Sequence, residues 1–167
     1  MPNRRARDST ESMRSLDLTF SSELTASERV VWTHATSMEG VNYELGPLVT
    51  MSVPRALVGH SITDAPLGRE AFVSTLKAFG VVPFDRHHLI LERVDEGGFS
   101  ERSWSWLQRS WWHDRTIEAL SIDTCRVIDR VRAVPRLRLS TRVVELIVKR
   151  TFQHRHARLR RKFGSTV

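Results

Sequence analysis

The chain has 167 residues, 40% of them hydrophobic and 27% charged, a balance typical of one globular domain with an apolar core. No apolar stretch approaches the ~20 residues that a membrane-spanning helix needs, so we expect no transmembrane segment. No apolar segment follows the charged start Met1–Arg5, so we expect no secretory signal and a cytoplasmic protein. The single cysteine, Cys125, excludes an internal disulfide and a cysteine-rich zinc site.

The net charge of +7 comes from one segment near the C-terminus. Seven basic residues and no acidic residue lie from Lys149 to Lys162, whereas the rest of the chain carries equal numbers of basic and acidic residues. Such a segment permits weak attraction to nucleic acid or to an anionic membrane surface. Arginine is abundant throughout the chain, so its presence here is not specific for phosphate binding. We therefore expect a solvated helix end without a specific nucleic-acid partner.

The N-terminal region divides into a polar tail and the start of the domain. Residues 1–15 carry mixed charge and show no apolar periodicity, which predicts a mobile tail. Leu16–Phe20 then alternates apolar and polar side chains, the pattern of a half-buried strand. We expect one domain from residue 16 to residue 164.

Two short helices are predicted after this strand. The first begins with the capping box Thr25–Glu28, in which the two side chains bond each other's backbone amides, and continues to about Ala35. The second begins after Ser37, continues through Glu44 and ends at Gly46-Pro47.

Strands dominate the central part of the chain, where apolar runs are separated by turn residues. The predicted strands are Leu48–Val53, Ala71–Val82, His87–Val94, Phe99–Gln108, Trp111–Leu120 and Cys125–Ala133. The predicted connections are an irregular segment at Pro54–Gly68 and turns at Pro83–Asp85, Asp95–Gly98, Arg109-Ser110 and Ser121–Asp123.

After Pro135 the apolar period changes to that of a long helix, Leu137–Phe163, with Gly164 as its stop. Its apolar stripe leaves Arg155, Arg158, Arg161 and Lys162 to spread over solvated faces. The stripe comprises Leu137, Val144, Val148, Phe152, His156, Leu159 and Phe163, thickened by Val143 and Ile147. The whole chain therefore predicts an α+β fold, in which one long helix packs on a curved antiparallel sheet of about six to seven strands.

The faces of the last strands predict which side chains point inward. Arginines alternate with apolar residues on Cys125–Ala133, so its odd-numbered positions face the core. A turn at Ser121–Asp123 pairs Arg115 with Asp129 and His113 with Val131.

A two-residue turn at Arg109-Ser110 then pairs Trp106 with His113 and Trp104 with Arg115. Indoles and aliphatic side chains around a few polar groups are the composition of a small-molecule pocket. The expected inner wall holds Trp104, Trp106, Trp111, His113, Arg115, Cys125 and Asp129.

The same residues also fit a closed core without a cavity. In that alternative, Arg115 and Asp129 form only a cross-strand ion pair with Trp104 stacked on the guanidinium, and His113 bonds to a backbone group. The tryptophans then fill all the space between sheet and helix.

Three motifs stand out along the chain: a Trp-x-His strand, an Arg-Val-x-Asp strand and an arginine-rich last helix. With two further segments they cover Ser37–Leu45, Phe79–Arg86, Trp111–Arg115, Arg126–Val131 and His154–Gly164. Together these segments resemble bacterial members of unassigned function in the START/SRPBCC superfamily, the helix-grip fold that includes polyketide cyclase/dehydratase-like and lipid-transfer proteins. The resemblance covers about residues 16–164.

This resemblance implies a cavity between the sheet and the long helix, and the binding of a small hydrophobic ligand there for transport or sensing. The expected ligand-binding residues are Trp104, Trp106, Trp111, His113, Arg115, Cys125, Asp129 and Phe152. The alternative is a polyketide cyclase/dehydratase-like enzyme that uses the same pocket. His113 would then act as the base and Arg115 as the cation that holds an enolate oxygen, with Asp129 fixing either of them.

Other chemistry lacks its sequence signals. Adjacent histidines such as His87 and His88 point to opposite faces of a strand, so they make a poor metal site. No Gly-x-Ser-x-Gly elbow and no glycine-rich phosphate loop occurs. We therefore expect no metal and no cofactor.

Overall fold

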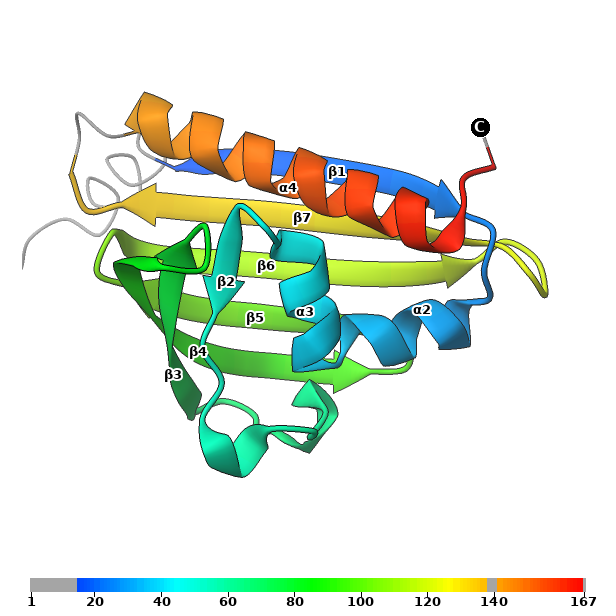
Figure 1. Ribbon diagram of the computed structural model, residues 1–167, viewed down its shortest axis with the longest axis horizontal. Helices are drawn as coiled ribbons and strands as arrows, with labels where there is room; N and C mark the ends of the chain where they lie inside the picture. Colours follow the sequence, from blue (N-terminus) through cyan, green and yellow to red (C-terminus); the bar gives the residue numbers. More distant parts are fainter. Residues whose placement is uncertain (1–14, 138–140, 167) are drawn as a thin grey trace, which may run out of the picture.

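The sheet and the long helix of the predicted fold are both present in the computed structural model, which describes residues 15–137 and 141–166 (Figure 1). In this part of the chain, seven antiparallel strands form one curled sheet in the order β1-β7-β6-β5-β4-β3-β2. The strands are β1 (Leu16–Leu24), β2 (Val49–Met51), β3 (Glu70–Ala78), β4 (Val82–Asp95), β5 (Gly98–Ser105), β6 (Gln108–Ala119) and β7 (Cys125–Pro135).

The helices lie against one face of this sheet. α4 (Thr141–Phe163) runs along β1 and β7 and contacts both strands, while α2 (Glu28–Ala35) and α3 (Met38–Leu45) lie across β6 and the end of α4 (Figure 1). Two short 3₁₀ helices, η1 (Arg55–Leu57) and η2 (Ile62–Asp64), occupy the connection from β2 to β3. The predicted α+β class, with one long C-terminal helix and two short helices after the first strand, is confirmed.

One of the two predicted helix caps is present. The Ser37 hydroxyl accepts a hydrogen bond from the Gly40 amide at 2.9 Å, as a capping residue should. The predicted capping box Thr25–Glu28 is wrong, because α2 begins after Ser27, whose side chain makes no capping bond. The Thr25 hydroxyl instead donates to the Phe163 carbonyl at 2.7 Å and so joins the segment after β1 to the end of α4.

Two predicted turns are also wrong. The residues Pro83–Asp85 lie inside β4, and the chain reverses before them at Phe79 and Gly80, which have φ angles of 50° and 75°. Likewise, Arg109-Ser110 lies inside β6, because β5 ends at Ser105 and the chain turns at residues 106–107. Turn residues such as proline are tolerated in a strand near its end, so they mark a strand end only within a few residues.

Apolar side chains form three clusters between the sheet and the helices. One joins α2 to the C-terminal half of α4, a second packs Val148 and Phe152 of α4 against β1 and β7, and a third lies between α3, η2 and the strands β4 and β5. No described helix is long and apolar enough to cross a membrane. The mobile tail predicted at 1–15 lies outside the described residues except for Ser15, as do residues 138–140 of the predicted helix.

Candidate ligand-binding site

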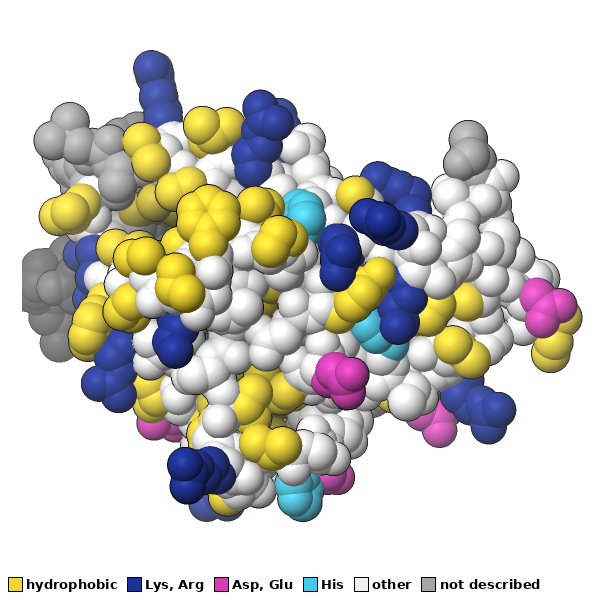
Figure 2. All heavy atoms as spheres, viewed as in Figure 1, with side chains coloured by type: hydrophobic (Ala, Val, Ile, Leu, Met, Phe, Trp, Pro, Cys, Tyr) yellow, Lys and Arg dark blue, Asp and Glu magenta, His cyan; other side chains and the backbone are white. Residues whose placement is uncertain are grey.

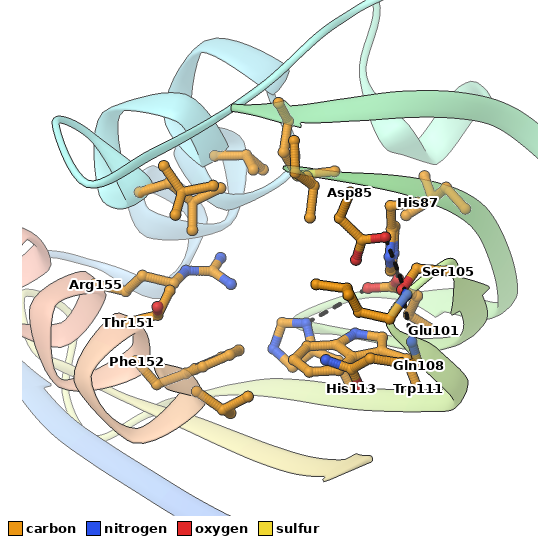
Figure 3. A pocket seen from close by; sticks show the side chains of 18 of the residues that line it. Asp85, His87, Glu101, Ser105, Gln108, Trp111, His113, Thr151, Phe152 and Arg155 are labelled. Carbon is orange, nitrogen blue, oxygen red and sulfur yellow. Dashed lines mark hydrogen bonds and ion pairs between the residues drawn. The ribbon is translucent and has the colours of Figure 1, made fainter. Parts of the chain in front are cut away.

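A cavity of about 230 Å³ lies between the sheet, α3 and the middle of α4 (Figure 3). Its walls are mostly apolar, because β4 and β5 turn alternate side chains inward and α3 and α4 close the opposite side. Typical apolar wall residues are Leu45, Met51, Leu89, Leu91, Phe99 and Phe152. The alternative of a core filled by tryptophans is therefore wrong.

Behind one wall of the cavity, Arg115 is completely buried and binds two carboxylates. Its Nε and Nη2 donate to the two oxygens of Asp129, each at 2.8 Å. Its Nη1 and Nη2 donate to the two oxygens of Glu44 at 2.8 and 2.9 Å. The predicted pairing of Arg115 with Asp129 across β6 and β7 is confirmed, and Glu44 from α3 adds a second bidentate contact.

Glu44 is shared between two arginines. Arg155 on α4 donates to Glu44 Oε2 from Nε at 3.0 Å, and its Nη2 lies 2.9 Å from the same oxygen. Arg155 is only 6% exposed, so its predicted place on a solvated helix face is wrong. This carboxylate therefore fixes α3, β6 and α4 relative to one another.

Asp129 also receives two imidazoles. The Nε2 atoms of His113 and His156 lie 2.8 and 3.0 Å from its two oxygens. On the far side of His156, its Nδ1 is hydrogen-bonded to Ser22 of β1 at 2.8 Å. All the charges around Arg115 thus have partners, as buried charges require.

A further pair of polar groups faces the cavity itself. His87 Nε2 lies 2.6 Å from Glu101 Oε1, and the other Glu101 oxygen lies 3.7 Å from Nδ1 of His113 (Figure 3). Both ring nitrogens of His113 therefore face carboxylates, those of Glu101 and Asp129.

The pKa values of these groups follow from burial and from their neighbours. Burial alone would raise the pKa of Glu101, but the charges of His87 and His113 outweigh burial and lower it. Burial opposes the ionised form of Asp129 in the same way, and Arg115 followed by His113 holds its pKa well below the usual value. For His113 the signs are reversed, since burial lowers its pKa while Asp129 and Glu101 outweigh burial and raise it. The network therefore favours an imidazolium between two carboxylates.

Two polar atoms on opposite walls of the cavity have no hydrogen-bond partner among the described residues. Arg155 binds Glu44 through Nε and Nη2, which leaves Nη1 as a free donor, and its guanidinium reaches toward the cavity (Figure 3). The Gln108 side chain lies on the opposite wall, and its buried Oε1 accepts no hydrogen bond. An unpaired buried polar atom such as Gln108 Oε1 is rare in folded proteins, so this atom is available to a molecule bound in the cavity.

The predicted site residues separate into three groups. Trp111, His113 and Phe152 line the cavity, whereas Arg115 and Asp129 lie behind its wall. Cys125 lies elsewhere, in the apolar cluster with α2 and the end of α4. The inward orientation predicted for Trp104 and Trp106 is wrong, because they are 37% and 59% exposed on the outer side of the sheet. On this side of the sheet the His88 ring stacks on Trp104, with 3.6 Å between the ring centres. The Arg86 guanidinium lies 5.7 Å from the Trp106 ring centre.

Sequence reasoning missed Glu44, Arg155 and the pair of Glu101 with His87. Arg155 could have been found, because Val148, Phe152, Arg155 and Leu159 repeat with the spacing of one buried helix face. Glu101 could have been found from alternation in β5 once the turn was placed correctly. Nothing local marks Glu44, since its partners lie 71 and 111 residues away along the chain.

No group of three His, Cys, Asp or Glu side chains in the described part of the chain could hold a metal ion. The His, Asp and Glu side chains near the cavity instead bind one another and the two arginines.

A family model described as "Domain of unknown function (DUF8410)" matches residues 22–163. The chain belongs to this family. The match covers the sheet from the end of β1 onward and all of α4, so it includes every residue of the cavity wall and of the Arg115 network. A comparison with curated proteins gives no match.

Solved structures similar to this DUF8410 protein share its fold at low sequence identity. A START superfamily protein from Mycobacterium smegmatis has a TM-score of 0.64 and 11% identity, with 88% of this chain and 96% of that chain covered. Zhui aromatase/cyclase from Streptomyces sp. R1128 has a TM-score of 0.63 and 10% identity, with 87% and 91% covered. A point mutant of Thalictrum flavum norcoclaurine synthase, in complex with a transition state analogue, has a TM-score of 0.60 and 11% identity, with 87% and 91% covered. The predicted resemblance to the START/SRPBCC superfamily is confirmed as a likeness of fold.

Proposed function

We propose that this protein binds a small lipophilic molecule in the cavity between the sheet and α4, for transport or sensing. The observation that carries the proposal is the cavity of about 230 Å³ with apolar walls, the unpaired Gln108 Oε1 and the free Nη1 of Arg155. Burying the ligand's apolar surface would supply most of the affinity, at ~25 cal/mol per Å².

The polar atoms of the wall indicate the chemistry of the ligand's polar end. Arg155 Nη1 is a charged donor, so it would bind an acceptor such as a carboxylate or a carbonyl oxygen. Gln108 Oε1 would accept from a hydroxyl or an amide on the same ligand. Trp111, His113 and Phe152 would contact the ligand directly, whereas Arg115 and Asp129 would act by holding His113 and Glu44 in place.

The test is displacement of the fluorescent probe 1-anilinonaphthalene-8-sulfonate from the cavity. We expect decanoate to displace the probe about tenfold better than decanol, because its carboxylate accepts a charged hydrogen bond from Arg155. Val49 lines the cavity from the edge strand β2, so Val49→Trp should block the space and abolish probe binding. The matched variant Val30→Trp adds the same ring on the half-exposed face of α2 and should bind the probe normally. Equal probe binding by the two variants would contradict the proposal.

A catalytic role in this pocket is supported less well. His113 has both ring nitrogens directed at carboxylates and a raised pKa, so it is a poor base. Arg115 uses Nε, Nη1 and Nη2 for Asp129 and Glu44, so it has little donor capacity left for an enolate oxygen. The cyclase/dehydratase-like alternative would instead have to use groups that reach the cavity, such as Arg155 and the Glu101–His87 pair.

A further inference from the structure

Large hydrophobic side chains are exposed together at one end of the molecule (Figure 2). Of the sixteen exposed large hydrophobic side chains among the described residues, ten lie in the segments 79–84, 104–107 and 143–147. We call these ten side chains the mouth patch. Three of them, Phe84, Leu107 and Ile147, also line the cavity, so the mouth patch surrounds the place where the cavity meets solvent. A patch of this kind on a soluble protein marks a surface that another body covers.

The fold brings these three segments to the same end. The β3–β4 turn, the β5–β6 turn and the first turns of α4 all lie at the left of Figure 1. The two turns are in contact, because the Arg86 guanidinium of β4 lies over the Trp106 ring, and one residue of each segment (Phe84, Leu107 and Ile147) lines the same cavity. The three segments therefore border one opening of the cavity, and the two tryptophans extend the mouth patch onto the outer side of the sheet.

Basic side chains surround the mouth patch. The described residues of these segments and their flanks (77–86, 104–109 and 136–150 without 138–140) contain seven basic side chains, and Glu145 is their one exposed acid. None of the seven forms an ion pair with a described residue, whereas four exposed arginines elsewhere on the sheet each have a carboxylate oxygen at 3.2 Å or less. The seven are Lys77, Arg86, Arg109, Arg136, Arg142, Lys149 and Arg150. The charge of this surface is thus left for a partner to neutralise.

The tip of the β3–β4 turn has an unusual residue for its backbone. Phe79 has a φ of 50° and is 70% exposed, and Gly80 follows it with a φ of 75°. Two successive positive φ angles favour Asn-Gly, and a bulky side chain there is strained. The backbone strain at Phe79 is not offset by packing of its ring in the core, which indicates a role for this ring at the surface.

We propose that the mouth patch docks the protein on the surface of an anionic phospholipid bilayer. Tryptophan and phenylalanine rings insert at the boundary between headgroups and acyl chains, and lysine and arginine bind the anionic headgroups around them. A second copy of this chain fits less well, because two basic surfaces would repel each other. In this orientation the cavity opens toward the lipid.

The test is co-sedimentation of the full chain with vesicles. We expect the protein to bind vesicles of equal parts phosphatidylcholine and phosphatidylglycerol, and not vesicles of phosphatidylcholine alone. Arg109→Gln with Arg150→Gln removes two charges of the mouth and should weaken binding about 30-fold. The matched variant, Arg130→Gln with Arg161→Gln, removes two exposed charges elsewhere and should weaken binding much less.

The apolar part of the surface has its own pair of variants. Phe79→Asn with Val81→Ser should weaken vesicle binding about tenfold or more, and asparagine also suits the positive φ at residue 79. Ile122→Ser, in the β6–β7 turn, removes an exposed side chain at the opposite end and should bind as the wild type does. Thermal unfolding identifies any variant that has lost its fold. The proposal is overturned if the wild type does not bind the anionic vesicles, binds neutral vesicles equally, or if folded mouth variants bind like their controls.

Discussion

Glu44 is fully buried and binds two arginines, Arg115 of β6 and Arg155 of α4. Glu44→Gln would leave two buried guanidiniums with too little negative charge, and breaking a buried ion pair in this way costs about 3–5 kcal/mol. We therefore expect a loss of that size in the free energy of unfolding, measured by urea denaturation. Glu118→Gln, at a half-exposed glutamate 3.9 Å from Arg126, should leave the midpoint unchanged. Equal midpoints for the two variants would contradict this assignment.

His113 gives the network a dependence on pH at the residue scale. Its pKa is raised in the folded protein, so the imidazolium stabilises the native state fully below the ordinary histidine value of 6.5. This stabilisation decreases as the pH rises above 6.5 and is lost once the pH passes the raised pKa. We expect the thermal midpoint of the wild type to fall over that range, and His113→Asn to lack this part of the fall. A wild-type midpoint that rises through this range would contradict the raised pKa.

At the scale of elements, one misplaced turn explains the wrong orientation predicted for Trp104 and Trp106 and the failure to identify Glu101. The β6–β7 pairing of His113 with Val131 and of Arg115 with Asp129 was predicted correctly, because arginines mark the solvated face of β7. Between β5 and β6 the chain turns at residues 106–107 and not at 109–110, and Glu101, five residues before the predicted partner Trp106, is opposite His113. The predicted and observed partners differ by an odd number of residues, which turns every β5 side chain to the other face. Nothing in β5 opposed the error, because serines and tryptophans alternate there and either set can face inward.

On α4, the charge of Arg155 led to the wrong prediction that its side chain is exposed, whereas its place in the apolar period indicates burial. Arg155 has the spacing of the buried stripe, and a buried carboxylate on α3 is what allows it to lie there. Such a partner is visible only after folding, because Glu44 and Arg155 are distant in sequence. The burial of Glu44 likewise depends on partners, Arg115 and Arg155, that are distant in sequence.

At the scale of the whole molecule, the order of elements was predictable and the chemistry of the cavity was not. The changes of apolar period mark a strand, two short helices, a meander and a long helix, and this order leaves few ways to bury every apolar face. The cavity instead lies between α4 and three elements, α3, β4 and β5, that are not neighbours of α4 in the sequence. Their polar groups therefore cannot be grouped by local spacing.

The whole molecule has a net charge of +7, which predicts attraction to DNA without sequence specificity. The basic residues of the segment 149–162 do not form one phosphate-binding row. Arg155 is buried on Glu44, and Arg158 donates to the Tyr43 carbonyl at 3.1 Å while its guanidinium lies 4.0 Å from the Tyr43 ring centre. Lys162 also lies against Tyr43, whereas Lys149 and Arg150 are exposed nearer the opposite end of α4.

Binding held by scattered charges depends on counterion release and weakens steeply as salt rises. We expect gel-shift titrations to show binding of unrelated DNA duplexes with equal affinity at about 50 mM salt and a loss of that binding at about 200 mM salt. Vesicle binding through the mouth patch should decline less over the same range, because exposed apolar side chains contribute to it independently of charge. Sub-micromolar binding of one duplex sequence that persists at the higher salt would contradict this prediction and indicate a specific nucleic-acid site.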